Sequence, residues 1–288
     1  MASQLKSVLI TGCSAGGIGA ALAEVFLERG YHVFATLRSP SKISETLSNA
    51  TNATILKLDV LSSESIDAAV ENVKTKTGGR LDVLVNNSGQ VLIAPGLDVS
   101  FAEGKRLFDL NFWAPLAMLQ AFSPLLIQAK GCVVNNSSAN AVLPMPFMSM
   151  YNASKAAFAM GSETWRHELQ PLGVRTITVI TCAVKTHALD NRQLCEMPKT
   201  SKYLDIQEFI REITGGKLQA NAISSRQYAF HIVGLVEKGT VGPVWAGTDA
   251  FMGRIAWWLS PQAVKDMIVQ SIIPISREMA KVAQTSKA

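Results

Sequence analysis

Three side chains that can hold or move a proton lie close together in the middle of the sequence. Tyr151 and Lys155 are four residues apart, and Ser138 lies thirteen residues before Tyr151, at the end of an apolar segment. An i,i+4 pair places the phenol and the ammonium on one side of a helix. A phenol titrates near 10, and a neighbouring ammonium favours the phenolate. We therefore expect Tyr151 to act as a general acid and base, and Lys155 to lower the pKa of Tyr151 while binding a cofactor ribose.

Two further polar residues could assist this pair. The Ser138 hydroxyl could orient a substrate carbonyl and stabilise the negative charge that develops on its oxygen, whereas Ser137 is interpreted as a residue that caps a turn. Asn111 interrupts an apolar helical segment, where a side-chain amide needs a hydrogen-bond partner. It is either a structural residue or the holder of a proton-relay water behind Lys155, and spacing alone leaves both interpretations open.

A glycine-rich turn runs from Thr11 to Gly19, between an expected strand and an expected helix. Glycines there allow a tight turn and let backbone N–H groups and a helix N-terminus approach a pyrophosphate. This pattern predicts dinucleotide binding by Gly12, Ser14, Gly16, Gly17, Ile18 and Gly19. The second expected strand ends at Arg38 without a carboxylate, which favours the 2′-phosphate of NADP, although an ordinary surface arginine is the alternative.

The elements that must position these residues alternate between strands and helices. Apolar segments predict strands at 7–11, 31–37, 53–59, 81–87, 131–137, 174–180 and 241–247. Amphipathic segments predict helices from 18 to 30, 62 to 79, about 103 to 130, 152 to 173 and from about 227. Such alternation is typical of an α/β fold, and we predict a Rossmann-type, doubly wound and mostly parallel seven-stranded sheet with helices on both faces, in a single domain.

The two remaining segments have a different character. We predict a dinucleotide-binding and catalytic unit over 1–250, containing a polar insert at about 186–225 that could act as a substrate lid, and an apolar helical tail over 251–288. Charged residues interrupt the tail too often for it to span a bilayer, so it lies on a membrane, covers the active site or forms a subunit contact. Apolar side chains before Tyr151 indicate an apolar guest: Met145, Phe147, Met148 and Met150.

Composition narrows the class of protein. The chain has 288 residues, is 48% hydrophobic and carries a formal charge of +5, but its basic residues are interspersed with acidic ones, which argues against a nucleic-acid partner. Widely spaced cysteines argue against a zinc site and a disulfide framework, and we expect no metal. The first residues do not read as a secretory signal. We expect a cytoplasmic protein, or one peripheral to an intracellular membrane or lipid droplet.

Taken together, the ordered set of motifs resembles the short-chain dehydrogenase/reductase family from about residue 6 to 250. Within it, the likeness is closest to the fungal NADPH-dependent acyl-dihydroxyacetone-phosphate reductase group, through residues 86–90, 129–131 and the tail. The resemblance implies a catalytic tetrad of Asn111, Ser138, Tyr151 and Lys155. It implies further cofactor contacts by Asp59, Val60, Asn86, Asn87, Gly89, Val184 and Thr186.

The implied activity is reduction of a ketone, or oxidation of a secondary alcohol, on an apolar small molecule with NADP(H), by a homo-oligomeric enzyme. The alternatives are a non-catalytic NADP(H)-binding protein and a dehydratase or epimerase of the same fold. Three departures from the family pattern affect the site: one additional residue in the glycine turn, Ser88 in place of alanine, and Cys182-Ala183 in place of Pro-Gly.

Overall fold

The computed structural model describes residues 5–186, 193–194, 197–214 and 221–285. Seven strands form one sheet in the order β11-β7-β6-β4-β1-β2-β3, and every neighbouring pair is parallel. The predicted doubly wound fold is confirmed. The strands are β1 (Ser7–Thr11), β2 (His32–Leu37), β3 (Ala53–Lys57), β4 (Val83–Asn86), β6 (Cys132–Asn136), β7 (Arg175–Thr181) and β11 (Gly242–Ala246).

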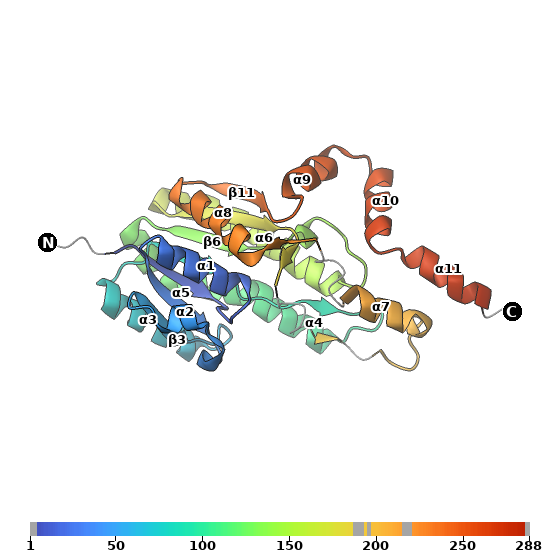
Figure 1. Cartoon of the computed structure of the whole chain (residues 1–288), viewed down its shortest axis with the longest axis horizontal. Helices are drawn as coiled ribbons and strands as arrows, with labels where there is room; N and C mark the ends of the chain where they lie inside the picture. The colour runs from blue at the N-terminus through green and yellow to red at the C-terminus, as the bar shows by residue number, and fades with distance from the viewer. Residues whose placement is uncertain (1–4, 187–192, 195–196, 215–220, 286–288) are drawn as a thin grey trace.

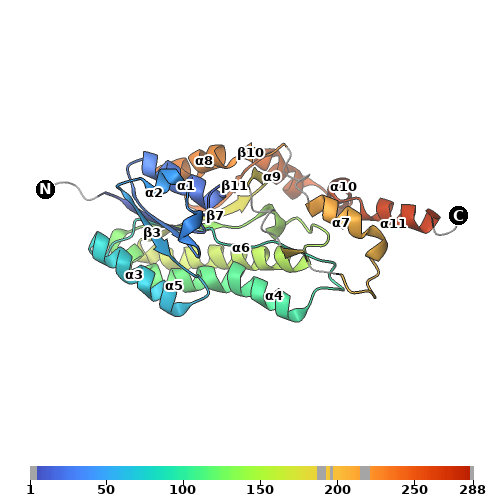
Figure 2. The ribbon, with the colours of Figure 1, turned by 60° about the horizontal axis from the view of Figure 1, so that its bottom comes forward.

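Helices cover both faces of this sheet (Figures 1 and 2). One face carries α1 (Ile18–Glu28), α2 (Glu45–Ser48) and α8 (Ser225–Glu237); the other carries α3 (Ser63–Thr77), α5 (Ala114–Ala129) and α6 (Ser149–Leu169). Residues of β1 show why two layers form, because side chains alternate along a strand. Val8 and Ile10 belong to the core beneath α1 and α8, whereas Leu9 belongs to the core with Phe122 and Leu126 of α5.

The helix preceding α5 is continuous with it but widens at the junction. α4 (Phe101–Phe108) begins with a capping box at Ser100 and runs into a π-helical turn, Asp109–Trp113, before α5 starts. Pro115 has no N–H to donate to the carbonyl of Asn111 four residues earlier, which accounts for the widened turn. By length and composition, 101–129 could cross a membrane, but Met118, Phe122 and Leu126 are buried against the sheet.

The two edges of the sheet have different connections. At the amino edge, the turns that follow α1, α3, α5, α6 and α8 are short, and each contains a residue with left-handed backbone: Gly30, Gly78, Lys130, Gly173 and Gly239, respectively. At the carboxyl edge the connections are long, and they carry the glycine turn, the segment between β6 and α6, and the segment between β7 and α8. The carboxyl edge is therefore where a ligand site can be built.

Beyond the sheet, a smaller apolar cluster forms a cap. It joins Met145, Phe147 and Met148 to residues of the insert and the tail, including Ile206, Ile210 and Ile273. The helices involved are α7 (Gln207–Thr214) and α11 (Ile275–Thr285), which lie near each other in both ribbon views. Two-residue strands form two separate parallel pairs: β5 (Leu92–Ile93) with β9 (Gln193–Leu194), and β8 (Val184–Lys185) with β10 (Ile223–Ser224).

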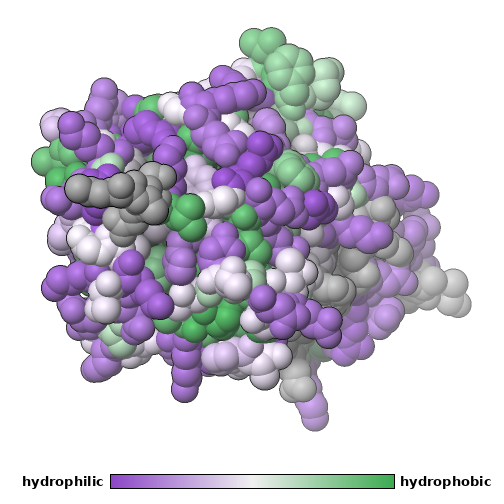
Figure 3. All heavy atoms as spheres, turned by 60° about the vertical axis from the view of Figure 1, so that its left-hand side comes forward, coloured by the Kyte–Doolittle hydropathy of each residue, from purple (hydrophilic) through white to green (hydrophobic). Residues whose placement is uncertain are grey.

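The tail continues from β11 as α9 (Ala250–Leu259) and α10 (Gln262–Ile272) before α11. These helices extend away from the sheet, so that α11 and the start of β1 lie on opposite sides of the molecule (Figure 1). The end that bears the N-terminus is mostly hydrophilic, with small apolar patches (Figure 3).

Candidate active site

A cleft of about 1300 Å³ opens at the carboxyl edge of the sheet. Its walls come from the glycine turn, the carboxyl ends of the other strands of the main sheet, α4, the start of α6, and the tail helices α9 and α10. Ser138, Tyr151 and Lys155 all line it. The structure thus brings together the hydroxyl, the phenol and the ammonium that the sequence predicts to act on one substrate.

Tyr151 lies on the first turn of α6, and Ser138 follows β6, where it caps a 3₁₀ turn by accepting a hydrogen bond from the N–H of Asn140 (3.2 Å). Burial raises the pKa of Tyr151, and a hydrogen bond with Ser138 acts in the opposite direction. We expected Lys155 to lower the pKa of Tyr151. In the cleft without a cofactor the pKa of Tyr151 is raised, because the effect of burial is the largest one. A proton held on the phenol is consistent with an acid that donates to a substrate oxygen.

The Lys155 ammonium is buried, with 5% of the residue exposed. It donates to the carbonyl of Asn136 (3.0 Å) and lies 5.5 Å from the centre of the Phe158 ring. Burial lowers the pKa of Lys155 to about 8, because the charged form loses water. A lysine near neutrality can take up and release a proton at physiological pH.

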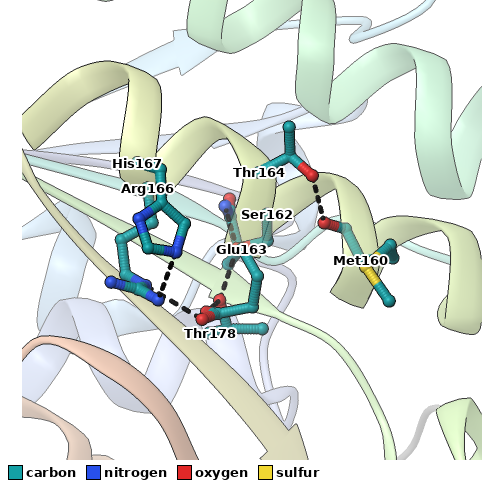
Figure 4. Close-up of polar contacts among 8 residues, drawn as sticks. Met160, Ser162, Glu163, Thr164, Arg166, His167 and Thr178 are labelled. Atoms are coloured by element: carbon teal, nitrogen blue, oxygen red, sulfur yellow. Dashed lines mark hydrogen bonds and ion pairs between the residues drawn. The ribbon is translucent and has the colours of Figure 1, made fainter.

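Helix α6 is fixed behind these residues by a chain of buried polar groups. Asn135 donates to the Ser162 hydroxyl (2.8 Å), which lies 2.6 Å from the Thr178 hydroxyl. Thr178 donates to the Glu163 carboxylate (2.5 Å), which also accepts from Arg166 (2.9 Å; Figure 4).

Nearer to Tyr151, Ser137 donates to the carbonyl of Lys155 (3.0 Å). These contacts hold α6 against β6 and β7, which a precise placement of Tyr151 requires.

Asn111 is buried and does not line the cleft. Its side chain accepts from the N–H of Gln90 (2.9 Å) and donates to the carbonyl of Gln90 (3.0 Å) and to the hydroxyl of Ser154 (3.1 Å). These contacts favour the structural interpretation for the side chain, which ties the segment after β4 to α6. A role in a proton relay stays a prediction.

The glycine turn has the features of a phosphate site. Gly12 and Gly16 both have φ of +77°, and Gly17 starts α1. Of the turn, Gly12, Ser14, Ala15, Gly17 and Ile18 line the cleft, so Gly17 rather than Gly16 faces it. Gly19 faces inward: a Cβ there would lie 2.3 Å from the carbonyl oxygen of Gly12.

The N-terminus of α1 adds to this site. No described side chain caps it, and its first turn holds no acidic residue, so its N–H groups and positive dipole end remain available to an anion. A nicotinamide dinucleotide therefore fits this end of the cleft.

Residues beyond the turn extend this wall. Arg38 lines the cleft at the end of β2 together with Lys42, and among the described residues its guanidinium has no hydrogen-bond or ion-pair partner. Asp59 and Val60, after β3, also line the cleft, and Asp59 accepts from the N–H of Leu61 (3.1 Å).

The residues of the Asn-Asn-Ser-Gly segment, 86–89, have different positions relative to the cleft. Asn87 and Gly89 line the cleft, and Asn87 donates to the carbonyls of Thr11 (2.9 Å) and Gly12 (3.3 Å). Asn86, predicted as a cofactor contact, instead points into the core and donates to the side-chain oxygen of Asn135 (2.9 Å). Its strand position explains this, because successive side chains of a strand point to opposite faces.

Val184 and Thr186, predicted as cofactor contacts, line the cleft. Here the Cys182-Ala183 pair replaces Pro-Gly, and hydrogen bonds from neighbouring segments fix its path. Cys182 donates through its N–H to the carbonyl of Ala246 (2.7 Å), and Thr248 donates to the carbonyl of Ala183 (3.0 Å). The departure from the family pattern therefore leaves an ordered backbone at this wall.

One cluster in the site was not predicted. The side-chain oxygen of Asn136 accepts from the hydroxyls of Thr181 (2.5 Å) and Tyr228 (3.2 Å), while its nitrogen donates to Asn87 (2.9 Å). The carbonyl of Asn136 also accepts from Lys155, so Asn136 connects Lys155 of α6 to Asn87, which in turn bonds the glycine turn. A polar residue in an apolar strand was the available signal for Asn136; Tyr228, on α8, gave none.

The far end of the cleft is apolar, as the sequence indicated, but its lining differs from the prediction. Met145 and Met148 line it, with Trp257 and Ile268 from the tail. Phe147 instead packs edge-on against Tyr203 in the cap (5.6 Å between ring centres), and Met150 packs against Gly104. Of the described insert residues, Thr186 reaches the cleft; 187–192, 195–196 and 215–220 lie outside the described residues.

Relatives of known family match this chain over most of its length. A model described as short chain dehydrogenase matches residues 6–195. The short-chain dehydrogenase ptmH of Penicillium ochrochloron is 42% identical over 94% of this chain and 99% of its own length. An NADPH-dependent 1-acyldihydroxyacetone phosphate reductase of Schizosaccharomyces pombe is 38% identical, covering 94% of this chain and 95% of the relative.

Solved structures agree. A short-chain dehydrogenase from Streptomyces avermitilis has a TM-score of 0.77 at 25% identity and covers 99% of this chain and all of its own. One from Burkholderia cenocepacia, in complex with NADP, has a TM-score of 0.72 at 25% identity and covers 93% of this chain and 98% of its own. The likeness predicted from the sequence is confirmed, and the chain belongs to the short-chain dehydrogenase/reductase family of oxidoreductases, which use a nicotinamide cofactor.

Proposed function

We propose that this protein is an NADP(H)-dependent oxidoreductase that interconverts a ketone and a secondary alcohol on an apolar small molecule. The observation that carries the proposal is the meeting of Ser138, Tyr151 and Lys155 in one cleft with the glycine turn. A binding protein would need the turn but has no use for a phenol, a hydroxyl and a buried ammonium along the same wall.

Each of these residues has a distinct task. A bound nicotinamide would supply or accept the hydride at the substrate carbon. Ser138 orients the substrate oxygen and donates to it as negative charge develops. Tyr151 delivers its proton to that oxygen in reduction and removes it in oxidation. Lys155, with a pKa lowered to about 8, holds the positive charge that stabilises the phenolate and returns a proton to it.

The preference for NADP rests on the end of β2. Thr36, Leu37 and Arg38 offer no carboxylate to a ribose 2′-hydroxyl, whereas Arg38 and Lys42 line the cleft with positive charge that suits a 2′-phosphate. The names of the Schizosaccharomyces pombe relative and of the Burkholderia cenocepacia complex agree with this choice.

The substrate end supports an apolar guest. Leu143, Met145, Met148, Trp257 and Ile268 line it, and methionine adapts to irregular apolar shapes. Ser138 and Tyr151 are the polar groups placed to receive one oxygen of such a molecule, an arrangement typical of small-molecule sites.

The decisive experiment compares Tyr151→Phe with Tyr203→Phe as a matched control, since Tyr203 lies in the cap and not in the cleft. With NADPH and a panel of apolar ketones, we expect Tyr151→Phe to lose at least about a thousandfold in kcat while binding NADPH normally. Tyr203→Phe should keep the wild-type rate. NADPH binding by wild type with no oxidation of NADPH by any ketone would favour a non-catalytic binding protein. Products formed without net redox change would favour a dehydratase or epimerase.

A further inference from the structure

Exposed apolar side chains gather on the tail helices. In the part of the chain that the structure describes, nineteen large apolar residues are exposed, and eight of them lie within 251–272. Five belong to α9, and we call them the outer face of α9: Phe251, Met252, Ile255, Trp258 and Leu259. Such clustering of exposed apolar surface marks an interaction site.

Helical spacing places these five residues on one side of α9. Positions 251, 255, 258 and 259 recur at intervals of three and four, and 252 lies beside them. Trp258 is 70% exposed and Leu259 is 79% exposed, so these side chains project from the molecule instead of folding back onto it.

The opposite side of α9 belongs to the cleft. Gly253, Ala256 and Trp257 line the cleft, and Lys265 of α10 lies 5.0 Å from the Trp257 ring. Neighbouring residues Trp257 and Trp258 therefore point to different environments. A single helix separates the apolar end of the cleft from the outer face of α9.

We propose that the outer face of α9 docks on a lipid surface, which places the apolar mouth of the cleft against the membrane. A tryptophan among aliphatic and aromatic side chains is the composition that settles at a membrane interface. The one charged residue of α9 is Arg254, and the described tail carries Arg254, Lys265, Arg277 and Lys281 against Asp266 and Glu278. This excess of positive charge suits anionic lipid headgroups.

Docking at this face would let a substrate enter the cleft from the bilayer, an inference that rests on the proposed function. An apolar ketone dissolves in a bilayer and is scarce in water, so a mouth that faces lipid meets it at a higher concentration. The helix that would touch the bilayer also forms one wall of the substrate end.

Vesicle flotation of the full chain tests the proposal without cofactor or substrate. The probes are vesicles of phosphatidylcholine alone and of phosphatidylcholine with phosphatidylserine. The variant is Trp258→Glu/Leu259→Glu. Its matched control is Leu97→Glu/Phe101→Glu, which makes the same change at two exposed apolar residues (78% and 92%) near the start of α4. Thermal unfolding of both variants confirms that they fold.

We expect wild type and the control to float, more strongly with phosphatidylserine, and the α9 variant to lose at least tenfold in partitioning. Arg254→Glu should weaken binding to the anionic vesicles alone. Wild type that stays in solution with both vesicle types, or a control that loses as much as the α9 variant, would overturn the proposal. So would a wild-type dimer that Trp258→Glu/Leu259→Glu dissociates without any vesicle binding, because a second copy would then cover this face.

Turnover of a water-soluble ketone separates the two proposals. The α9 variant should keep the wild-type rate, because its substituted residues do not line the cleft. Absence of turnover in all variants, with flotation intact, would count against the proposed function and not against the docking.

Discussion

Substituting Gly19 by alanine tests how the glycine turn is built. Gly19 lies in the first turn of α1, and an added Cβ would lie 2.3 Å from the carbonyl oxygen of Gly12 and 2.6 Å from the side-chain nitrogen of Asn87. Real Cβ atoms do not approach closer than 3.0 Å, so the Gly12 carbonyl must move by the difference of 0.7 Å. Overpacking of this kind costs about 1–3 kcal/mol, which exceeds the roughly 1 kcal/mol that alanine adds in a helix.

The matched control is Gly234→Ala in α8, where an added Cβ has no heavy atom within 4 Å. We expect Gly19→Ala to lower the free energy of unfolding by up to about 2 kcal/mol and to weaken NADPH binding at least tenfold, because Gly12 lines the cleft. Gly234→Ala should raise stability by about 0.5–1 kcal/mol and leave binding unchanged. Urea unfolding and fluorescence titration with NADPH measure both quantities. If Gly19→Ala matches wild type in both, the packing argument is wrong.

Three other predictions follow from the site. The pKa of Lys155 is lowered from 10.5 to about 8, so the unfolded chain holds more protons between these values and the contribution of this group to stability rises with pH over that window. Between pH 7.5 and 10.5, urea unfolding should therefore show that the free energy of unfolding of the wild type rises by about 2–3 kcal/mol relative to that of Lys155→Met. If the two free energies change in parallel with pH, this prediction is wrong. Tyr228→Phe, which removes the hydroxyl that bonds Thr181 and Asn136, should cost about 1–2 kcal/mol of stability and lower kcat more than it raises KM; unchanged kcat would show that the cluster does not position Lys155. Arg38→Glu should move the ratio of kcat/KM for NADPH over NADH at least tenfold toward NADH, and an unchanged ratio would make Arg38 an ordinary surface residue.

Much of this architecture follows from local patterns in the sequence. Apolar runs such as 7–11 and 131–137 predict buried parallel strands, and the carboxyl ends of such strands meet at one edge, which places Ser138 near the glycine turn before any coordinates are known. The spacing of Tyr151 and Lys155 likewise fixes their common side of α6. These features depend on neighbours within a few residues along the chain.

The parts that escaped prediction depend on contacts between distant segments. Phe147 lies between the cleft residues Met145 and Met148 in sequence, but it packs against Tyr203 in the cap, a partner that no local pattern identifies. The Tyr228 hydroxyl meets Asn136 across 92 residues. The direction of the Tyr151 pKa shift also needed coordinates, because desolvation is a property of the assembled cleft and outweighs the neighbour that the sequence reveals.

The short left-handed turns at the amino edge have an evolutionary consequence. Each turn reverses the chain in a few residues, and none of Gly30, Gly78, Lys130, Gly173 and Gly239 lines the cleft. The turns that maintain the fold therefore lie at the amino ends of the strands, and the residues that select a ligand lie at the carboxyl ends. Insertions that retune specificity can accumulate in the segment after β7 while the scaffold is inherited intact, so paralogues that process different metabolites should diverge in that segment and share these reversals.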